Sequence, residues 1–163
     1  MDLLGIELDI LLAHLGKLVV AFLITLPVAW NREASTRAMG LRTFPLVAVA
    51  SCGFILLGQQ VLAGNQEAQA RIIAGLMTGM GFVGGGAILK YEGNVYGTAT
   101  AASIWGTGLI GGAVAYGHYE IAILVSLLSL GLLLFLQPLK NSIHGDEVPE
   151  HDRLPENDYD GTG

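Results

Sequence analysis

A glycine-rich run of twenty residues constrains the fold of this chain more than any other segment. It extends from Arg71 to Lys90, has no charge between its ends, and contains glycine at 75, 79, 81, 84, 85 and 86. At a rise of about 1.5 Å per residue, such a helix covers the roughly 30 Å hydrocarbon core of a bilayer. In water each glycine would cost about 0.5–1 kcal/mol relative to alanine, whereas in lipid a helix cannot unravel without exposing unpaired backbone groups. The run therefore predicts a membrane helix.

The spacing of these glycines predicts close helix contacts. Gly75 and Gly79 are four residues apart, as are Gly81 and Gly85, so each pair lies on one helix face. Small residues let neighbouring backbones approach closely in a membrane. We therefore expect this helix to be the central, tightly surrounded member of a bundle, with packing contacts at Gly75, Gly79, Gly81, Gly84, Gly85 and Gly86.

Two other interpretations of the glycine run exist. Gly79, Gly81 and Gly84 spell the GxGxxG fingerprint of dinucleotide-binding proteins, which needs a preceding strand and an acidic residue about twenty positions later. Here the preceding residues continue the apolar helix and another apolar segment follows, so the context disfavours a nucleotide site. The second alternative is that the triplet at 84–86 interrupts the helix, as in transporters whose binding sites use broken helices.

Composition and charge divide the chain into two parts. The chain is 52% apolar and only 13% charged, unlike an ordinary soluble domain. Up to Lys140 seven basic residues balance seven acidic ones, and the net charge of -6 comes from the remainder, where only Arg153 opposes the acids. We expect a transmembrane domain over 1–140 and an acidic, disordered cytoplasmic tail over 141–163. The chain has no basic patch, so nucleic acid is not an expected partner.

Five segments are long enough to span a bilayer, at about 8–30, 43–63, 71–90, 98–116 and 119–136. The links between them are short, which favours antiparallel neighbours. The predicted fold is therefore an all-α bundle of five transmembrane helices. Pro45 suits the opening turn of the second helix, with Thr43 as its expected cap.

The basic residues predict the orientation. Arg32, Arg37 and Arg42 follow the first segment, Lys90 follows the third, and Lys140 follows the fifth, whereas the opposite side receives only Arg71. Because cytoplasmic loops carry an excess of lysine and arginine, we expect the N-terminus outside and the C-terminus in the cytoplasm. We therefore expect a multi-pass membrane protein.

Lys17 is the first candidate functional residue, because it stands inside a predicted span. A lysine at the centre of a membrane helix costs roughly 2.5–3.5 kcal/mol on insertion scales. We expect its side chain to lean toward the face with Glu7 and Asp9, where His14 is a neighbour in a polar crevice. The alternative is an anchoring lysine whose ammonium reaches the interface.

The arginine loop over 31–43 is the second candidate. Arginine forks bind carboxylates and phosphates with two parallel hydrogen bonds, which suits lipid headgroups or the acids of a partner. The alternative is that Arg32, Arg37 and Arg42 only set the topology.

The fourth segment repeats the small-residue pattern, with expected packing contacts at Gly106, Gly108 and Gly112. Its hydroxyls are expected to hydrogen-bond across helices or, alternatively, to line a polar path; they are Thr98, Thr100, Ser103 and Thr107. No carboxylate pair lies in the apolar segments and no histidine accompanies their serines. We therefore expect no enzymatic activity, cofactor or metal site.

Three ordered motifs resemble the MgtC/SapB family of bacterial inner-membrane proteins. Residues 37–43, RAMGLRT, with Leu46 and Val47, resemble its AGLRT…LV signature. Residues 71–88 resemble its R…TGIGFLGAGxI, and residues 97–105, GTATAASIW, resemble its GLTTAATLW. Lys17 stands where the family usually has arginine. The resemblance covers about 8–135, and we expect a short member without the ACT-like cytoplasmic domain of some relatives.

Two departures from the family pattern affect the arginines. An acidic residue at the end of the first span is Asn31 here, and the acid that precedes Arg71 by three positions is Ala68, with Glu67 one place away. Both changes remove expected ion-pair partners.

The resemblance implies a five-span bundle that serves growth at low magnesium and survival within hosts, including virulence. It further implies restraint of the proton-driven ATP synthase rather than magnesium transport. We therefore expect helix–helix contacts with a membrane partner, or with a second copy in a homo-oligomer. The alternative is a small transporter or channel whose path is lined by Lys17, Arg71 and the glycine-rich helix. The expected functional residues are Lys17, Arg32, Arg37, Arg42, Thr43, Arg71, Thr100 and Trp105.

Overall fold

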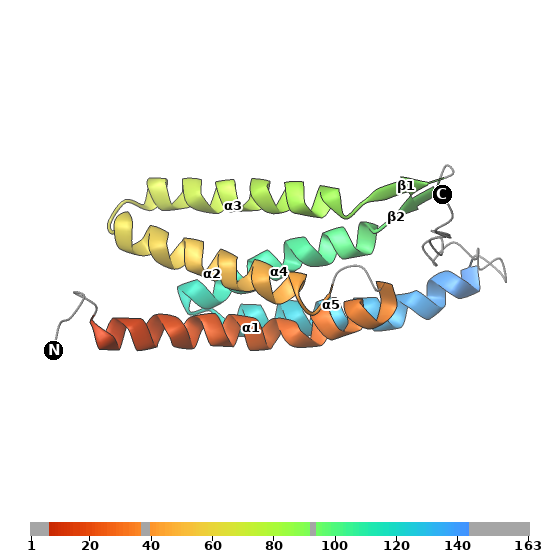
Figure 1. The fold of residues 1–163 in the computed structure, drawn as a ribbon, viewed down its shortest axis with the longest axis horizontal. Helices are drawn as coiled ribbons and strands as arrows, with labels where there is room; N and C mark the ends of the chain where they lie inside the picture. Colours follow the sequence, from red (N-terminus) through yellow and green to blue (C-terminus); the bar gives the residue numbers. More distant parts are fainter. Residues whose placement is uncertain (1–6, 37–39, 92–93, 144–163) are drawn as a thin grey trace, which may run out of the picture.

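The computed structural model describes residues 7–36, 40–91 and 94–143 and consists of five helices that run along one long axis, with a small hairpin at one end (Figure 1). The elements are α1 (Leu8–Thr36), α2 (Thr43–Val61), α3 (Gln66–Gly86), β1 (Leu89–Tyr91), β2 (Asn94–Tyr96), α4 (Thr98–Tyr116) and α5 (Tyr119–Ile143).

Each helix overlaps one of the five apolar segments, so a largely helical fold of five helices is confirmed, although α3 begins before 71 and ends at Gly86, and residues predicted as its last turn form β1. Three of the described helices, α1, α2 and α5, are long and apolar enough to cross a membrane. α3 and α4 have 21 and 19 residues, but glycine and hydroxyl residues dilute their apolar character. The five-span topology and the orientation stay predictions.

Several element boundaries differ from expectation. Thr43 is the first residue of α2 rather than its cap, and Arg42 holds the cap position without a side-chain hydrogen bond. Pro45 does lie in the opening turn. α5 continues to Ile143, beyond the predicted end of the fifth span at 136, and residues 144–163 of the tail predicted over 141–163 lie outside the described residues.

The hairpin between α3 and α4 was not predicted. α3 runs without interruption to Gly86, and the chain then forms two antiparallel strands in which Leu89 pairs with Tyr96. A broken helix at the glycine triplet is therefore not observed, because no second half-helix follows. Gly97 joins the hairpin to α4 with φ +81°, and a Cβ there would overlap the carbonyl oxygen of Ala87. Only glycine suits this position.

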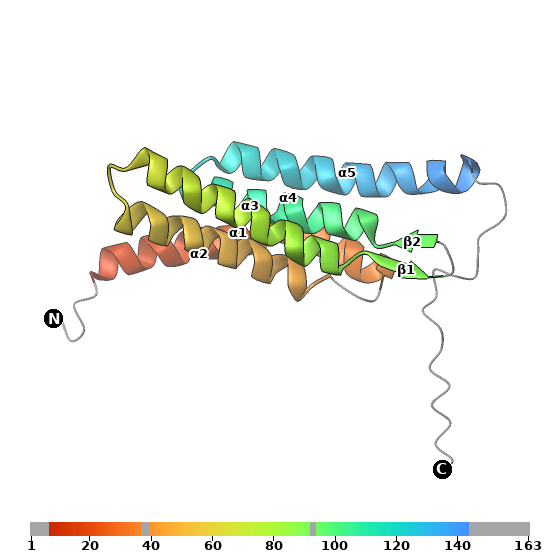
Figure 2. The same ribbon diagram turned by 90° about the horizontal axis from the view of Figure 1, so that it is seen from above.

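α4 is the central helix, and the prediction that the 71–90 helix is central is wrong. α4 packs against α1, α2, α3 and α5, and more than half of its residues are buried. α3 packs on α2 and α4, and its only buried described residues are Met80 and Gly84. Figure 2 shows α3 on the outside of the bundle, with α4 behind it. Glycine content alone does not distinguish a central helix from an outer one.

The core is built from small side chains where helices cross. Its larger cluster joins α1, α2, α4 and α5 and includes Ala21, Ala48, Cys52, Ile110 and Val114. A smaller cluster contains Val28, Ala29, Phe44, Ala87 and Ile104. Alanine lets backbones approach closely, which is the main source of helix association in lipid.

The two ends of the bundle differ in charge among the described residues. The end with the α1–α2 connection and the hairpin, here called the basic end, has Arg32, Arg42 and Lys90 against Glu33. The opposite end, called the acidic end, carries two cations against four carboxylates; these residues are Lys17, Arg71, Glu7, Asp9, Glu67 and Glu120.

Candidate functional site

Lys17 caps the end of α4 instead of facing the carboxylates at the start of α1. Its Nζ donates a hydrogen bond to the carbonyl oxygen of Ala115, 2.7 Å away and 98 residues later in the chain. The last carbonyls of a helix have no partner within it and carry partial negative charge, so an ammonium group stabilises them. Among the described residues Lys17 makes no ion pair with Glu7 or Asp9. The expected polar crevice on that face is therefore not observed, and the half-buried lysine links α1 to α4.

The basic end contains a contact that the sequence motifs did not reveal. The backbone N–H of Leu41 donates to Glu33 Oε2 at 3.0 Å, and a Cβ at Gly40 would come within 2.6 Å of Glu33. Glu33 in α1 thus holds the segment that leads into α2, and Gly40 is required by this close approach. The sequence shows that Glu33 precedes the motif that contains Gly40 by a few residues. It does not show that Glu33 contacts this motif.

The arginines of this region occupy different environments. Arg32 is 7% exposed and follows Val28 and Ala29 of the smaller core cluster by about one helical turn. Arg42 is exposed at the start of α2. Arg37 lies outside the described residues. Thr43, adjacent to Arg42, is half-buried.

Arg71 pairs within its own helix. Its Nη2 lies 2.7 Å from Glu67 Oε1, and both side chains are 79% exposed. Glu67 therefore replaces the acid that is missing at Ala68, contrary to the expected loss of a partner. Lys17 contacts α4 while Arg71 contacts Glu67, so the two cations of the alternative transport path do not contact each other.

The hydroxyls of α4 mostly bond to their own helix. Ser103 Oγ donates to the carbonyl of Ala99 at 2.7 Å, and Thr107 Oγ1 donates to that of Ser103 at 2.9 Å. The expected hydrogen bonds across helices are therefore not formed by these two residues. Such a bond does join α5 to α1, where Ser126 Oγ donates to the carbonyl of Ile24 at 2.7 Å. Thr100 is buried near the start of α4.

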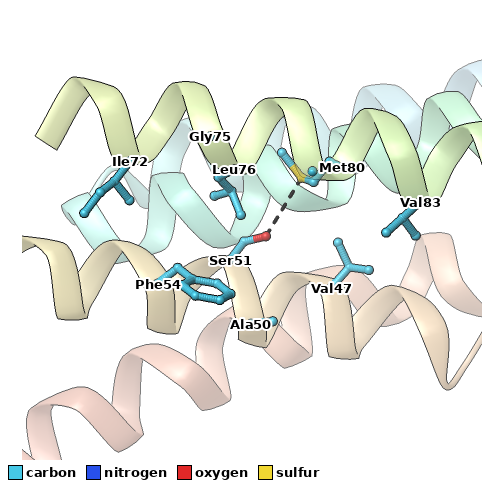
Figure 3. A pocket seen from close by; sticks show the side chains of 10 residues that line it. Val47, Ala50, Ser51, Phe54, Ile72, Gly75, Leu76, Met80 and Val83 are labelled. Carbon is cyan, nitrogen blue, oxygen red and sulfur yellow. Dashed lines mark hydrogen bonds between the residues drawn. The ribbon is translucent and has the colours of Figure 1, made fainter.

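An apolar groove of about 490 Å³, here called the α2–α3 groove, separates parts of these two helices. Figure 3 shows their side chains facing each other across it, with the hydroxyl of Ser51 directed at Met80. Ser51 Oγ donates a weak hydrogen bond to Met80 Sδ at 3.9 Å. The groove is lined by Val47, Ala50, Ser51, Phe54, Ile72, Gly75, Leu76, Gly79, Met80 and Val83.

A second groove of about 250 Å³ lies on the other side of α3, against α4 and α5. Trp105, which is partly exposed, lines it together with Met77 and Leu109. Met80 lines both grooves, and its side chain occupies the space that a Cβ at Gly108 would need. Leu76 also lines both grooves, so Met80 and Leu76 together separate them, and Met80 fixes α3 to α4.

The glycines predicted to pack against other helices fall into two groups: those whose added Cβ would meet a neighbouring helix and those whose added Cβ would meet no atom. A Cβ at Gly84 would lie 3.2 Å from the carbonyl oxygen of Ala101, and one at Gly106 would lie 3.7 Å from Ser129 Oγ. With Gly108, these are the predicted positions that approach a neighbouring helix. The others have no atom within 4 Å of an added Cβ; they are Gly75, Gly79, Gly81, Gly85, Gly86 and Gly112.

Two close contacts involve glycines that were not predicted. A Cβ at Gly111 would overlap the carbonyl oxygen of Ala48, and one at Gly58 would lie 2.6 Å from Ile72 Cδ1. Gly111 thus sets the distance between α2 and α4.

Comparison with known proteins adds to this geometry. The model of the MgtC family matches residues 18–142. The chain is 34% identical over 128 residues to the uncharacterized protein slr0014 of Synechocystis, a match that covers 78% of this chain and 54% of that protein. It is 32% identical over 123 residues to the "Putative magnesium transporter YhiD" of Escherichia coli K12, covering 72% and 57%.

A third similarity is to the protein MgtC of Brucella abortus, at 32% identity over 129 residues, covering 78% of this chain and 53% of that protein. The chain spans about half the length of these curated relatives. No solved structure matches it.

Proposed function

Because this chain belongs to the MgtC family, we propose that it is a non-enzymatic, multi-pass protein of the bacterial inner membrane that supports growth when magnesium is scarce. It acts through contacts between its helices and a membrane partner. Three apolar helices that are long enough to cross a bilayer support the membrane location.

The proposed topology has five spans, with the N-terminus outside and the C-terminus in the cytoplasm. Its support is the excess of cations at the basic end, which the positive-inside rule assigns to the cytoplasm. Reporter fusions test it: one placed after Lys140 is expected to read cytoplasmic and one at the N-terminus external. An external reading after Lys140 would contradict the topology.

The observation that carries the partner proposal is the exposed outer side of α3. Phe82 is 86% exposed, and the neighbouring Gly81 and Gly85 have open space where a Cβ would lie. In lipid, helices associate through van der Waals packing rather than through the hydrophobic effect, so an exposed glycine surface offers a close contact to another helix. We propose that this side of α3 contacts the partner.

Following the family resemblance, we propose the proton-driven ATP synthase as that partner. A photo-crosslinking residue at Phe82 in native membranes is expected to capture subunits of that complex. The same residue at Phe135 of α5, which is 77% exposed, is the matched control and is expected to capture none. Equal capture from both sites, or a second copy of this chain captured at Phe82, would contradict the ATP synthase proposal.

A transport function is the second candidate, because one relative, YhiD of Escherichia coli, is named a putative magnesium transporter. Among the described residues, Lys17 bonds to Ala115 and Arg71 pairs with Glu67, so these two cations do not line one common path for an ion. Purified protein in proteoliposomes distinguishes the two functions: we expect no magnesium flux above that of empty vesicles. Flux that Lys17→Leu abolishes would favour transport.

A further inference from the structure

We propose that the α2–α3 groove binds one acyl chain of an anionic phospholipid, whose phosphate lies at the basic end beside Arg42. This inference is independent of the partner proposed above. It concerns the side of α3 that faces α2, where Gly75 and Gly79 line the groove, whereas Gly81 and Gly85 of the surface assigned to the partner do not line it.

The shape of the groove selects a chain rather than a helix. Toward the acidic end, Ile72 closes against Gly58, and the contact of Ser51 with Met80 forms the floor. From Ile72 to Val83 the groove follows eleven residues of α3, about 16 Å at the rise of an α-helix. A helix with its side chains is about 10–12 Å wide and does not fit between two helices that touch beneath it. An extended hydrocarbon chain does.

The lining of the groove suits hydrocarbon. Its walls are aliphatic and aromatic apart from Ser51, whose hydroxyl already donates to Met80. An empty groove forfeits dispersion contacts, and apolar cavities of proteins accept apolar guests. In a bilayer the surrounding apolar molecules are acyl chains, so a lipid fills this space without leaving its leaflet.

Charge determines at which end the headgroup lies. Arg42 is exposed and precedes Val47 of the groove by five residues, about 7.5 Å along the axis. Thr43 lies one turn before Val47 on the same side of α2. The planar guanidinium group of arginine binds phosphate with two hydrogen bonds. Lys90, in strand β1 of the hairpin, adds a second cation at this end. At the other end Arg71 is already paired with Glu67, among further carboxylates that repel phosphate.

Native mass spectrometry of the detergent-purified protein tests the acyl site. Palmitoyl-oleoyl phosphatidylglycerol is the probe, and the wild type is expected to retain one molecule per chain. Gly79→Leu places a side chain in the groove, and its Cβ would meet no atom within 4 Å. We expect it to lower retention about tenfold, equivalent to 1.4 kcal/mol. Gly85→Leu is the matched control: the same change on the same helix, also into open space but outside the groove, is expected to retain the lipid.

The headgroup is tested separately with phosphatidylglycerol and zwitterionic phosphatidylcholine of identical chains. Wild type is expected to prefer phosphatidylglycerol about tenfold, because both lipids carry the phosphate but the choline cation of phosphatidylcholine is repelled by Arg42 and Lys90. Arg42→Gln should remove most of that preference while keeping acyl binding. Arg71→Gln, the same change at an exposed arginine of the acidic end, should leave the preference intact.

Three results would overturn the proposal. The first is equal lipid retention by Gly79→Leu and Gly85→Leu. The second is an unchanged headgroup preference in Arg42→Gln, and the third is loss of a dimer instead of a lipid in Gly79→Leu, which would assign the groove to a second copy. If circular dichroism shows that Gly79→Leu does not fold, Ala50→Phe fills the groove from α2, where Ala50 is exposed, and must give the same loss.

Discussion

α3 and α4 are both rich in glycine, yet they occupy opposite environments in this protein. α4 packs against all four other helices, whereas α3 lies outside them and has grooves on both flanks. In α4, glycine removes a Cβ that would otherwise strike a neighbour, as at Gly111 against Ala48. In α3, most glycines have open space where a Cβ would lie. The same residue thus shapes an internal contact in one helix and an external surface in the other.

This difference separates two uses of small residues in a membrane helix. A glycine against a neighbouring backbone contributes to the stability of the single chain, because close approach maximises van der Waals contact. A glycine on an open face contributes nothing until a lipid or another helix covers it. Comparing substitutions in α4 with equal substitutions in α3 therefore distinguishes folding from binding.

The largest expected effect is that of Gly111→Leu in α4. Its side chain would collide with the Ala48 carbonyl and force α2 and α4 apart, a change that we expect to cost roughly 3 kcal/mol. The measurement is thermal unfolding in detergent, together with the yield of inserted protein. Gly85→Leu in α3 is the control and is expected to unfold at nearly the wild-type temperature. If both substitutions lower the unfolding temperature equally, the proposed difference between glycines in α4 and glycines in α3 is wrong.

Met80→Ala is expected to have the next largest effect, because Met80 is the buried link between α3 and α4. Its removal leaves a cavity at Gly108 and joins the two grooves, which should cost about 2 kcal/mol by analogy with other core truncations. Met77→Ala truncates the same residue type one turn away, where the side chain is 43% exposed, and should cost much less. Unfolding temperatures measured in the same detergent compare the two; a larger loss for Met77→Ala would mean that α3 is attached elsewhere.

The sequence predicted the elements of this fold better than their arrangement. The bounds of α4 agree with prediction because Gly97 and Gly117 flank an apolar run of spanning length. The central position was assigned to α3 because its glycines satisfy the same four-residue spacing. What separates the two helices is the presence or absence of atoms opposite each glycine, such as the Ala48 carbonyl beside Gly111. That information depends on the tertiary structure.

The candidate site shows the same limit. A lysine inside a span signals a compensating partner, and the sequence offered Glu7 and Asp9 because they are near in the chain. The observed partner is a backbone carbonyl 98 residues away. Because every residue has a backbone carbonyl, the amino-acid sequence does not indicate which one accepts the hydrogen bond. The short strands of the hairpin were missed for a related reason: three residues are too few to establish an alternating pattern.

Lys17→Leu is expected to have a smaller effect than the core substitutions, since two terms oppose each other. Loss of the ammonium leaves the Ala115 carbonyl without this donor, which should cost about 1.5–3 kcal/mol for a bond to a charged group. Removing a charge from a membrane helix returns much of that cost. Because the two terms nearly cancel, we expect a net loss of at most about 1 kcal/mol, measured by unfolding in detergent, with Lys17→Arg close to wild type. A Lys17→Leu protein more stable than wild type would show that the lysine is retained for a function other than capping α4.

Arg71→Gln in α3 is expected to have the smallest effect and completes the comparison with Lys17. The Arg71–Glu67 pair lies on an exposed helix surface, where pairs four residues apart contribute about 0.3–0.5 kcal/mol. Salt screens exposed charges strongly and part-buried ones weakly, so added salt should abolish the difference between Arg71→Gln and wild type. It should leave the deficit of Lys17→Leu largely unchanged, because the Lys17–Ala115 bond is part-buried. Unfolding temperatures at low and high salt measure both differences. If Arg71→Gln destabilises the protein as much at high salt as at low salt, Arg71 has a buried partner and the acidic end of α3 is not the open surface described above.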